Sequence, residues 1–302
     1  MFELWIPVTI AAAFSQNVRS ALQKHLKSKL STAGATSARF VYAVPFAILY
    51  ALFLHKGMDF TLPEPNLRFA IYGVIGGVAQ IVATALLVYL FSFRNFAVGT
   101  TYSKTETVQA AIFGLVILGD TLTTGAVVGI MVSLVGVMAI SQARQETGMK
   151  GLLTSLTQKT ALIGIASGAA FGISAVAYRA SSLSLGGEGF LMQAAFTLAC
   201  VTAMQAVIMG VYLRAREPGE ITRVLRNWKI AGLVGLSGML GSACWFTAMT
   251  IQNVAYVRAL GQIELVFTFA ASYFFFKEKT NRMEFLGILA IIAGILVLLL
   301  WR

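Results

Sequence analysis

The chain has 302 residues, of which 58% are hydrophobic and 12% charged, and its mean hydropathy is +0.79. This composition excludes a soluble globular domain, in which about 25% of residues are charged, and it predicts an integral membrane protein. The net charge of +11 does not indicate nucleic-acid binding, because the cations lie mainly in short loops and form no separate basic surface.

Apolar runs long enough to cross a bilayer recur almost from end to end of the chain. A hydrocarbon core of about 30 Å needs roughly 20 apolar residues in a helix. Ten such runs predict ten transmembrane helices, at 4–24, 33–54, 68–91, 97–118, 123–141, 160–181, 189–213, 228–250, 255–276 and 283–301. The predicted fold class is therefore an all-α integral membrane protein, because lipid leaves backbone groups no other partner.

Basic residues collect in alternate connections between the predicted helices. The connections that join helices 1 to 2, 3 to 4 and so on hold fifteen cations: Lys24, Lys27, Lys29, Arg94, Arg144, Lys150, Lys159, Arg214, Arg216, Arg223, Arg226, Lys229, Lys277, Lys279 and Arg282. The termini and the other connections hold Lys56, Arg68, Arg179 and Arg302. The positive-inside rule predicts that the fifteen are cytoplasmic and that both termini lie outside.

The second half of the sequence repeats the first at an offset of 158 residues. The segment "NFAVGTTYSKTETV" from Asn95 aligns with "NVAYVRALGQIELV" from Asn253. Matched pairs at this offset are Asn95 with Asn253, Ala97 with Ala255, Glu106 with Glu264, Asp120 with Glu278, Gly129 with Gly287, and Gly136 with Gly294. We predict two five-helix repeats, 1–141 and 160–302, joined by a polar linker at 142–159.

Five helices per repeat is an odd number, so the second repeat enters the membrane in the opposite direction to the first. This predicts an inverted repeat about an axis in the membrane plane. If the two halves exchange slightly different conformations, an outward-open cavity becomes an inward-open one. Such alternating access favours a carrier over a channel or an enzyme.

The last two helices of each half carry a family resemblance. The segments "LGDTLTTGAVVGIMVSLVGVMAI" and "FKEKTNRMEFLGILAIIAGILVLLL" resemble the drug/metabolite transporter superfamily of the EamA type. The resemblance implies helices around a central cavity and a substrate among amino acids, other metabolites, nucleotide-linked sugars, phosphorylated compounds or drugs. Members commonly have a Glu-Pro pair early in the fourth and ninth helices. Glu106 and Glu264 occupy the glutamate positions, but Thr107 and Leu265 replace the prolines.

Ionisable residues inside the predicted helices are candidate site residues, because a charge at the bilayer centre costs at least about 2.5 kcal/mol. On a continuous helix Lys104 and Glu106 point about 160° apart, whereas Arg258 and Gln262 share a face. We predict that Lys104, Arg258 and Gln262 face the cavity and that Glu106 and Glu264 lean toward neighbouring helices. The other predicted substrate-binding residues are Arg19, Arg39, Tyr42, Gln80, Tyr102, Tyr178 and Trp245.

Each of these residues also has a structural interpretation. The two glutamates either hold an arginine of another helix, such as Arg19 or Arg39, or carry a coupling proton. Lys104 and Arg258 either bind substrate or pair with a glutamate, and the aromatic residues are also common between helices.

Acids and glycines near the predicted helix ends have a simpler structural interpretation. Asp120 and Glu278 are predicted to cap helix starts, and Arg94 and Arg179 to mark the membrane interfaces. Four glycines spaced by seven residues predict close helix packing, within the chain or in a dimer: Gly129, Gly136, Gly287 and Gly294.

The predicted cavity has more cations than acids: Arg19, Arg39, Lys104 and Arg258 compared with Glu106 and Glu264. This excess of positive charge favours a substrate with an anionic group. The leading hypothesis is a secondary active transporter that moves a small anionic or zwitterionic metabolite across the cell inner membrane. An amino acid is the favoured substrate and export the favoured direction. The expected partners are the substrate, the bilayer and, as a candidate, a coupling proton, in a monomer or homodimer without cofactor or metal.

Two competing functions remain at the level of sequence. The first is a multidrug or lipid-linked sugar carrier of the same superfamily. The second is an intramembrane enzyme, which needs a paired nucleophile and base or a metal cluster. His25 and His55 are the only histidines and lie at predicted helix ends, which disfavours the enzyme.

Overall fold

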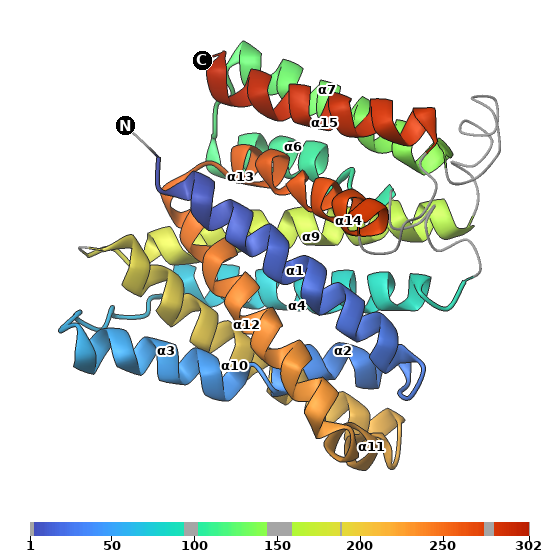
Figure 1. Ribbon diagram of the computed structural model, residues 1–302. Helices are drawn as coiled ribbons and strands as arrows, with labels where there is room; N and C mark the ends of the chain where they lie inside the picture. Colours follow the sequence, from blue (N-terminus) through green and yellow to red (C-terminus); the bar gives the residue numbers. More distant parts are fainter. Residues whose placement is uncertain (1–2, 94–101, 144–158, 188, 275–280, 302) are drawn as a thin grey trace.

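A computed structural model of the chain describes residues 3–93, 102–143, 159–187, 189–274 and 281–301 (Figure 1). Its described regular elements are helices, which confirms an all-helical fold. They are α1 (Trp5–Lys27), α2 (Thr32–Val41), α3 (Val44–Gly57), α4 (Leu67–Leu90), α6 (Glu106–Leu118), α7 (Thr124–Ala143), α9 (Lys159–Ser184), α10 (Phe190–Arg216), α11 (Glu220–Arg226), α12 (Trp228–Ile251), α13 (Val254–Gly261), α14 (Ile263–Phe274) and α15 (Arg282–Leu300).

Six helical segments of the described chain are long and apolar enough to cross a membrane by length and composition. They are Thr32–Gly57, Leu67–Leu90, Lys159–Ser184, Phe190–Arg216, Trp228–Ile251 and Arg282–Leu300. Shorter apolar helices at Glu106–Leu118 and Thr124–Ile140 accompany them. The chain is therefore a multi-pass membrane protein.

The predicted helix at 33–54 is interrupted, and α2 and α3 meet at Tyr42 and Ala43. The cause is Pro45, which lies in the first turn of α3. Proline has no amide hydrogen and cannot donate to the carbonyl four residues earlier, so a helix ends before it. The expectation of one continuous helix here was wrong.

A second kind of interruption occurs at the same place in both repeats. Lys104 and Thr105 form a turn before α6, and Gln262 separates α13 from α14. The Thr107 amide donates to the Lys104 carbonyl at 3.5 Å, and the matching Leu265 amide donates to the Gln262 carbonyl at 2.9 Å. Such bonds to the residue three positions earlier belong to a tighter turn than the α-helix and often mark functional sites. The interruption forms here without proline.

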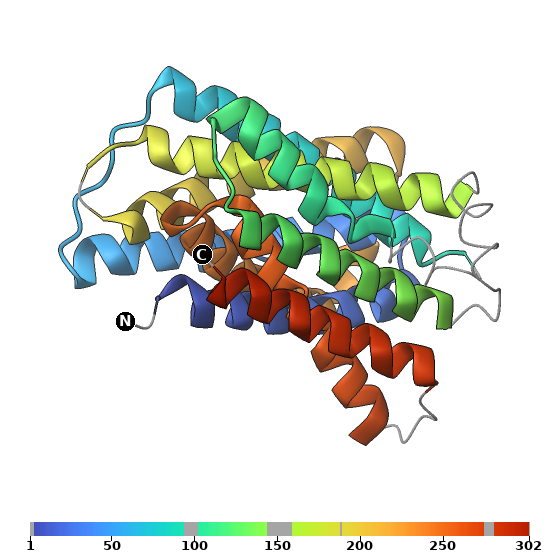
Figure 2. The same ribbon diagram turned by 90° about the horizontal axis from the view of Figure 1, so that it is seen from above.

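Helices of the two repeats pack in matched pairs across the molecule. α1 of the first repeat packs on α12 of the second, and α9 of the second packs on α4 of the first (Figure 1). α1 begins at the end where the N-terminus lies, whereas α9 begins at the opposite end. The last helices of the two repeats, α7 and α15, pack on each other along one side of the molecule (Figure 2).

The predicted glycine contacts join α7 to α15. A Cβ atom on Gly294 would lie 2.6 Å from the carbonyl oxygen of Gly129, and one on Gly136 would lie 2.6 Å from that of Gly287. The backbones of the two helices therefore approach too closely for any side chain at these positions. Of the two sequence alternatives, the structure shows packing within the chain.

Replacing Gly294 by Ala is expected to lower the thermal unfolding midpoint in detergent, with a loss of stability of about 1 to 3 kcal/mol, because the backbones must move apart. Gly210→Ala on α10 is the matched control, since no atom lies within 4 Å of the added Cβ. Equal midpoints for the two variants would contradict the close α7–α15 contact.

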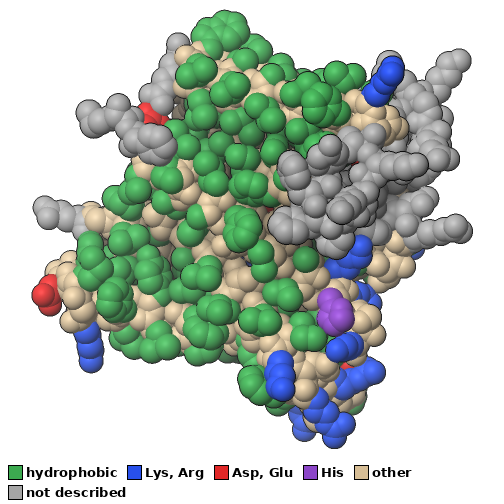
Figure 3. All heavy atoms as spheres, in the orientation of Figure 1, with side chains coloured by type: hydrophobic (Ala, Val, Ile, Leu, Met, Phe, Trp, Pro, Cys, Tyr) green, Lys and Arg blue, Asp and Glu red, His purple; other side chains and the backbone are tan. Residues whose placement is uncertain are grey.

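Charged and apolar side chains are separated on the surface. Hydrophobic side chains cover the band between the two ends of the visible face, whereas Lys and Arg side chains gather at the end where α11 lies (Figure 3). Lys24, Arg214 and Arg226 are exposed residues of that basic end. Both chain termini lie at the opposite end. This arrangement matches a protein whose middle band contacts lipid.

Candidate functional site

A cavity of about 140 Å³ lies between helices of both repeats. Its lining comes from α1, α2, α4, α6, α9, α12, α13 and α14 and from the short segments after α4 and before α6. The lining residues are Gln16, Asn17, Arg19, Ser20, Arg39, Gln80, Leu87, Phe91, Ser103, Lys104, Glu106, Phe171, Tyr178, Ser242, Trp245, Phe246, Met249, Arg258, Glu264 and Thr268.

The first buried ion pair of the cavity joins Glu106 at the start of α6 to Arg258 on α13. Nη1 of Arg258 lies 3.3 Å from Oε1 of Glu106, and the two side chains are 7% and 12% exposed. The Arg258 guanidinium also lies over the ring of Trp245, 4.6 Å from its centre. A cation over an indole face gains further attraction, so Arg258 is fixed on two sides.

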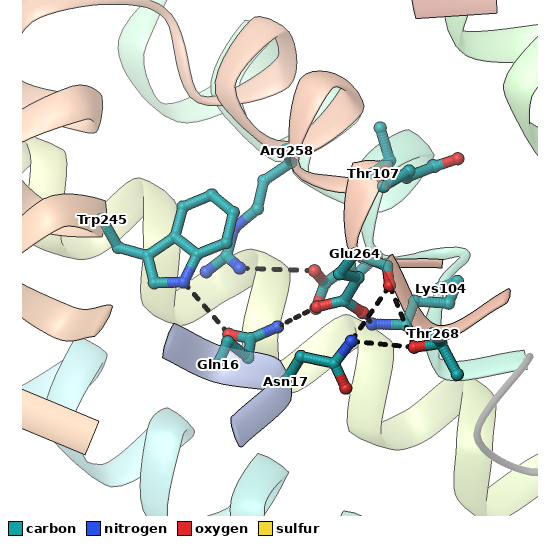
Figure 4. Close-up of polar contacts among 10 residues, drawn as sticks. Gln16, Asn17, Lys104, Thr107, Trp245, Arg258, Glu264 and Thr268 are labelled. Atoms are coloured by element: carbon teal, nitrogen blue, oxygen red, sulfur yellow. Dashed lines mark hydrogen bonds and ion pairs between the residues drawn. The ribbon is translucent and has the colours of Figure 1, made fainter. Parts of the chain in front are cut away.

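The second ion pair joins Lys104, just before α6, to Glu264 on α14 (Figure 4). Nζ of Lys104 contacts one carboxylate oxygen of Glu264. The other oxygen accepts a hydrogen bond from Nε2 of Gln16 at 2.8 Å, and the side-chain Oε1 of Gln16 accepts from Nε1 of Trp245 at 3.1 Å. Both oxygens of Glu264 are thus occupied, and the chain of bonds fixes the indole.

The two ion pairs are reciprocal with respect to the repeats. Glu106 and Glu264 are repeat mates, and each pairs with a cation of the opposite half. One sequence expectation was wrong here, because both glutamates line the cavity instead of leaning away from it. Of the two alternatives for Lys104 and Arg258, the structure shows pairing with the glutamates, which therefore do not pair with Arg19 or Arg39. The pairs bring the two repeats together at the centre of the molecule.

Arg19 on α1 and Arg39 on α2 are the other two cations of the lining. They are 3% and 5% exposed. Nη1 of Arg39 donates to the hydroxyl of Thr84 at 2.7 Å. Arg19 makes no hydrogen bond or ion pair with any described residue, and its buried Nε has no partner there. The described lining therefore contains four cations and two acids, and both acids are already paired.

Comparisons with known proteins place this arrangement in a family. The sequence profile of the EamA-like transporter family matches residues 3–142 and 158–300, one match for each half of the chain. The chain belongs to the EamA-like transporter family. The EamA-like proteins are membrane transporters, not enzymes. No curated protein matches the sequence.

Solved structures share the fold of this EamA-like transporter. Of 29 matching chains, one that is described only as the crystal structure of a protein is 15% identical. The match covers 96% of this chain and 99% of that one, with a TM-score of 0.66. At this identity the likeness shows the fold alone.

Several predicted site residues lie together and others lie apart from the cavity. Gln80, Tyr178 and Trp245 line it, and the Tyr178 hydroxyl donates to Oε1 of Gln80 at 3.0 Å. Gln262 is buried and lines a small neighbouring pocket instead of the cavity. Its side chain donates to the hydroxyl of Thr107 at 2.9 Å, and Thr107 lines the same small pocket.

Two predicted site tyrosines of this EamA-like transporter are used for packing. Tyr42 packs its backbone against Gly235 of α12, where a Cβ atom would lie 2.6 Å from the Tyr42 carbonyl carbon. Tyr102 is buried beside Ala161, Ile165 and Met138. The expectation that both tyrosines line the cavity was wrong.

Several polar residues that line or support the cavity were not among the predicted site residues, including Gln16, Asn17, Thr268 and Thr84. Nδ2 of Asn17 donates to the Glu264 carbonyl at 3.1 Å and to the Thr268 hydroxyl at 2.8 Å, and Thr84 holds Arg39. A polar residue one turn after a buried acid, as Thr268 is after Glu264, is the signal that could have found Thr268. Thr84 has no such local signal.

Polar contacts also join helices at the end where the termini lie, and those made by Asp120 and Thr123 cross between the two repeats. Nη1 of Arg179 on α9 donates to the Met249 carbonyl at 2.6 Å and contacts the Gln252 carbonyl. Nε of Arg179 lies 3.9 Å from Oδ2 of Asp120 in the α6–α7 turn. We call the contacts of Arg179 with Met249, Gln252 and Asp120, together with the contact between Thr123 and Tyr256, the terminal clasp.

Thr123 completes the terminal clasp. Its amide donates to the Tyr256 hydroxyl at 3.3 Å, and the two hydroxyls lie 3.0 Å apart. The Thr123 hydroxyl also accepts from the Ala126 amide at 3.2 Å and so caps α7. Asp120 was predicted to provide this cap and instead faces Arg179. Its repeat mate Glu278 lies outside the described residues, as does Arg94.

Proposed function

We propose that this EamA-like protein is a secondary active transporter that carries a small anionic or zwitterionic metabolite across the cell inner membrane. An amino acid is the favoured substrate and export the favoured direction. The observation that carries the proposal is the charge of the cavity. Four cations face two acids, and both acids are already held in ion pairs. Such a site repels a cationic drug and attracts a carboxylate or a phosphate.

The size of the cavity supports a small substrate. A cavity of about 150 Å³ in a protein core can hold a molecule such as benzene. The present cavity, at about 140 Å³, is of this size in the described conformation. A lipid-linked sugar or a large drug needs more room, so the cavity favours a small metabolite.

Alternating access is the mechanism that we propose. It rests on ten membrane-spanning helices in two inverted repeats, with the interrupted helices at α2–α3 and α13–α14 each counted as one span. The antiparallel starts of α1 and α9 support inversion, and the matched interruptions at Lys104 and Gln262 supply bends in both repeats. The terminal clasp closes one end, and exchange of the two conformations opens it. Glu106 and Glu264 are the described carboxylates that can carry a coupling proton once their ion pairs open.

Orientation follows from the basic end of the surface. We propose that this end is cytoplasmic and that both termini lie outside. A single cysteine added after Arg302, in a chain with Cys200→Ser and Cys244→Ser, is expected to react with a membrane-impermeant maleimide in intact cells. Reaction only after the cells are broken would reverse the orientation.

Transport itself is tested by reconstitution into liposomes. We expect that at least one compound from a panel of labelled amino acids, organic acids and sugar phosphates is taken up, and that the lipophilic cation tetraphenylphosphonium is not. Protein-free liposomes give the background. Uptake of the lipophilic cation without uptake of any anion or zwitterion would reject the proposal and favour a drug carrier.

A further inference from the structure

Arg19 and Arg39 come from different helices and lie side by side over one residue of α12. A Cβ atom added to Gly238 would lie 3.4 Å from Cδ of Arg19 and 3.5 Å from Cγ of Arg39. Both side chains line the cavity and both are almost fully buried. The aliphatic parts of the two side chains therefore lie over the same residue of α12, and both side chains reach the same cavity.

Neither of these two cations forms an ion pair with a described residue. The described acids of the lining are Glu106 and Glu264, and each is paired with another cation. Arg39 has the neutral hydroxyl of Thr84, and Arg19 has no hydrogen-bond partner among the described residues. A buried charge without a partner is expensive, and two like charges in one cavity repel each other. A bound anion would therefore stabilise this arrangement.

We propose that Arg19 and Arg39 form the subsite that holds the anionic group of the substrate, a carboxylate or a phosphate. Guanidinium groups present paired donors whose geometry fits both anions. The proposal rests on the proposed function, because it assigns a place to that substrate. It also moves the anion away from Lys104 and Arg258, whose charges are neutralised by their own glutamates.

Aromatic side chains lie close to this subsite and suit the rest of a small ligand. The rings of Tyr178 and Phe246 lie against each other at a tilt of 33° with their centres 4.4 Å apart, and Trp245 is held in place by Gln16 and Arg258. All three line the same cavity. A planar ring that carries one carboxylate is therefore a suitable probe, and benzoate with its neutral isostere benzamide separates charge from shape.

The test measures equilibrium binding of benzoate, benzamide and inorganic phosphate to the purified full chain in neutral detergent. We expect benzoate to bind at least about tenfold more tightly than benzamide. Arg19→Gln and Arg39→Gln are each expected to remove most of this tenfold preference, whereas Arg19→Lys keeps part of it because the charge remains. Arg226→Gln, the same change on an exposed arginine of α11, is expected to leave the ratio unchanged.

A second measurement separates a binding role from a structural one. Without ligand, Arg19→Gln removes an unpaired buried charge, so its thermal unfolding midpoint is expected to equal or exceed that of the original chain. Added benzoate is expected to raise the midpoint of the original chain and not that of the variant. A large drop in the midpoint of the ligand-free variant would mean that Arg19 is structurally satisfied, and would overturn the proposal.

Three further results would also overturn it. They are equal affinities for benzoate and benzamide, an unchanged preference in both Gln variants, and no binding of benzoate or phosphate at millimolar concentrations. Failure of the subsite is distinguishable from failure of the proposed function. Anion-selective binding without transport in liposomes would support the proposed subsite and reject the proposed carrier function. Transport of an anion that neither Gln variant affects keeps the carrier and rejects the subsite.

Discussion

Glu106→Gln is expected to destabilise the folded protein by about 3 kcal/mol. This loss is at the low end for removing one partner of a buried ion pair, because the pair of Glu106 and Arg258 borders a cavity. The variant leaves the guanidinium of Arg258, which is 7% exposed, without its carboxylate. An arginine cannot lose its charge at accessible pH. Arg258→Gln is expected to cost less, because the remaining carboxyl group of Glu106 can take up a proton and become neutral.

The double variant Glu106→Gln with Arg258→Gln is the decisive comparison. It removes both charges, so its stability is expected to exceed that of Glu106→Gln alone. Titration with sodium dodecyl sulphate in mixed micelles, followed by circular dichroism, measures the free energies of unfolding. Glu64→Gln, an exposed residue between α3 and α4, is the matched control. If the double variant loses the sum of the two single-variant losses in free energy of unfolding, the ion pair contributes nothing to stability.

Arg179→Gln is expected to open the end of the molecule where the termini lie. The change removes the guanidinium that joins α9 to the Met249 and Gln252 carbonyls and to Asp120. A charged hydrogen bond contributes about 1.5 to 3 kcal/mol, and about 1.4 kcal/mol changes a conformational equilibrium tenfold. The open population is therefore expected to rise at least about tenfold.

Labelling of a cavity cysteine measures this opening. Ser242 lines the cavity, and Ser242→Cys in a chain without Cys200 and Cys244 is an almost isosteric reporter. In intact cells its reaction with an impermeant maleimide is expected to be about tenfold faster when Arg179 is replaced by Gln. Arg68→Gln, an exposed arginine at the start of α4, is the matched control. Equal rates would show that the terminal clasp does not hold the end closed.

The positions of the helices could be predicted because lipid imposes long apolar helices on any chain that crosses it. Pro45 could also have predicted the break between α2 and α3. The breaks at Lys104 and Gln262 have weaker signals, because no proline or glycine adjoins Lys104 and Gly261 alone adjoins Gln262. They accompany contacts between helices far apart in sequence, such as the hydrogen bond from Gln262 to Thr107. Tertiary contacts of this kind override local helix propensity.

The break at Lys104 explains why the geometry of the site was predicted incorrectly. Lys104 and Glu106 point apart on a continuous helix, but a turn lies between them, so both reach one cavity. Sequence identified the buried charges, since a charge in an apolar helix stands out. It left open whether Lys104 and Arg258 pair with the glutamates, because pairing depends on how the two repeats meet. Thr84 illustrates the limit, because an ordinary threonine becomes the support of Arg39 only through packing.

The first helix of each repeat packs on a helix of the other repeat, and this packing has a consequence for biosynthesis. α1 leaves the ribosome first, yet the helix on which it packs, α12, begins only at Trp228. α4 likewise lacks its partner until α9 has been inserted. The newly inserted first half therefore has two unpaired helix surfaces in the lipid until most of the chain is made. We expect the protein to become resistant to membrane proteases late in synthesis, and chains that stop after the first half to be degraded.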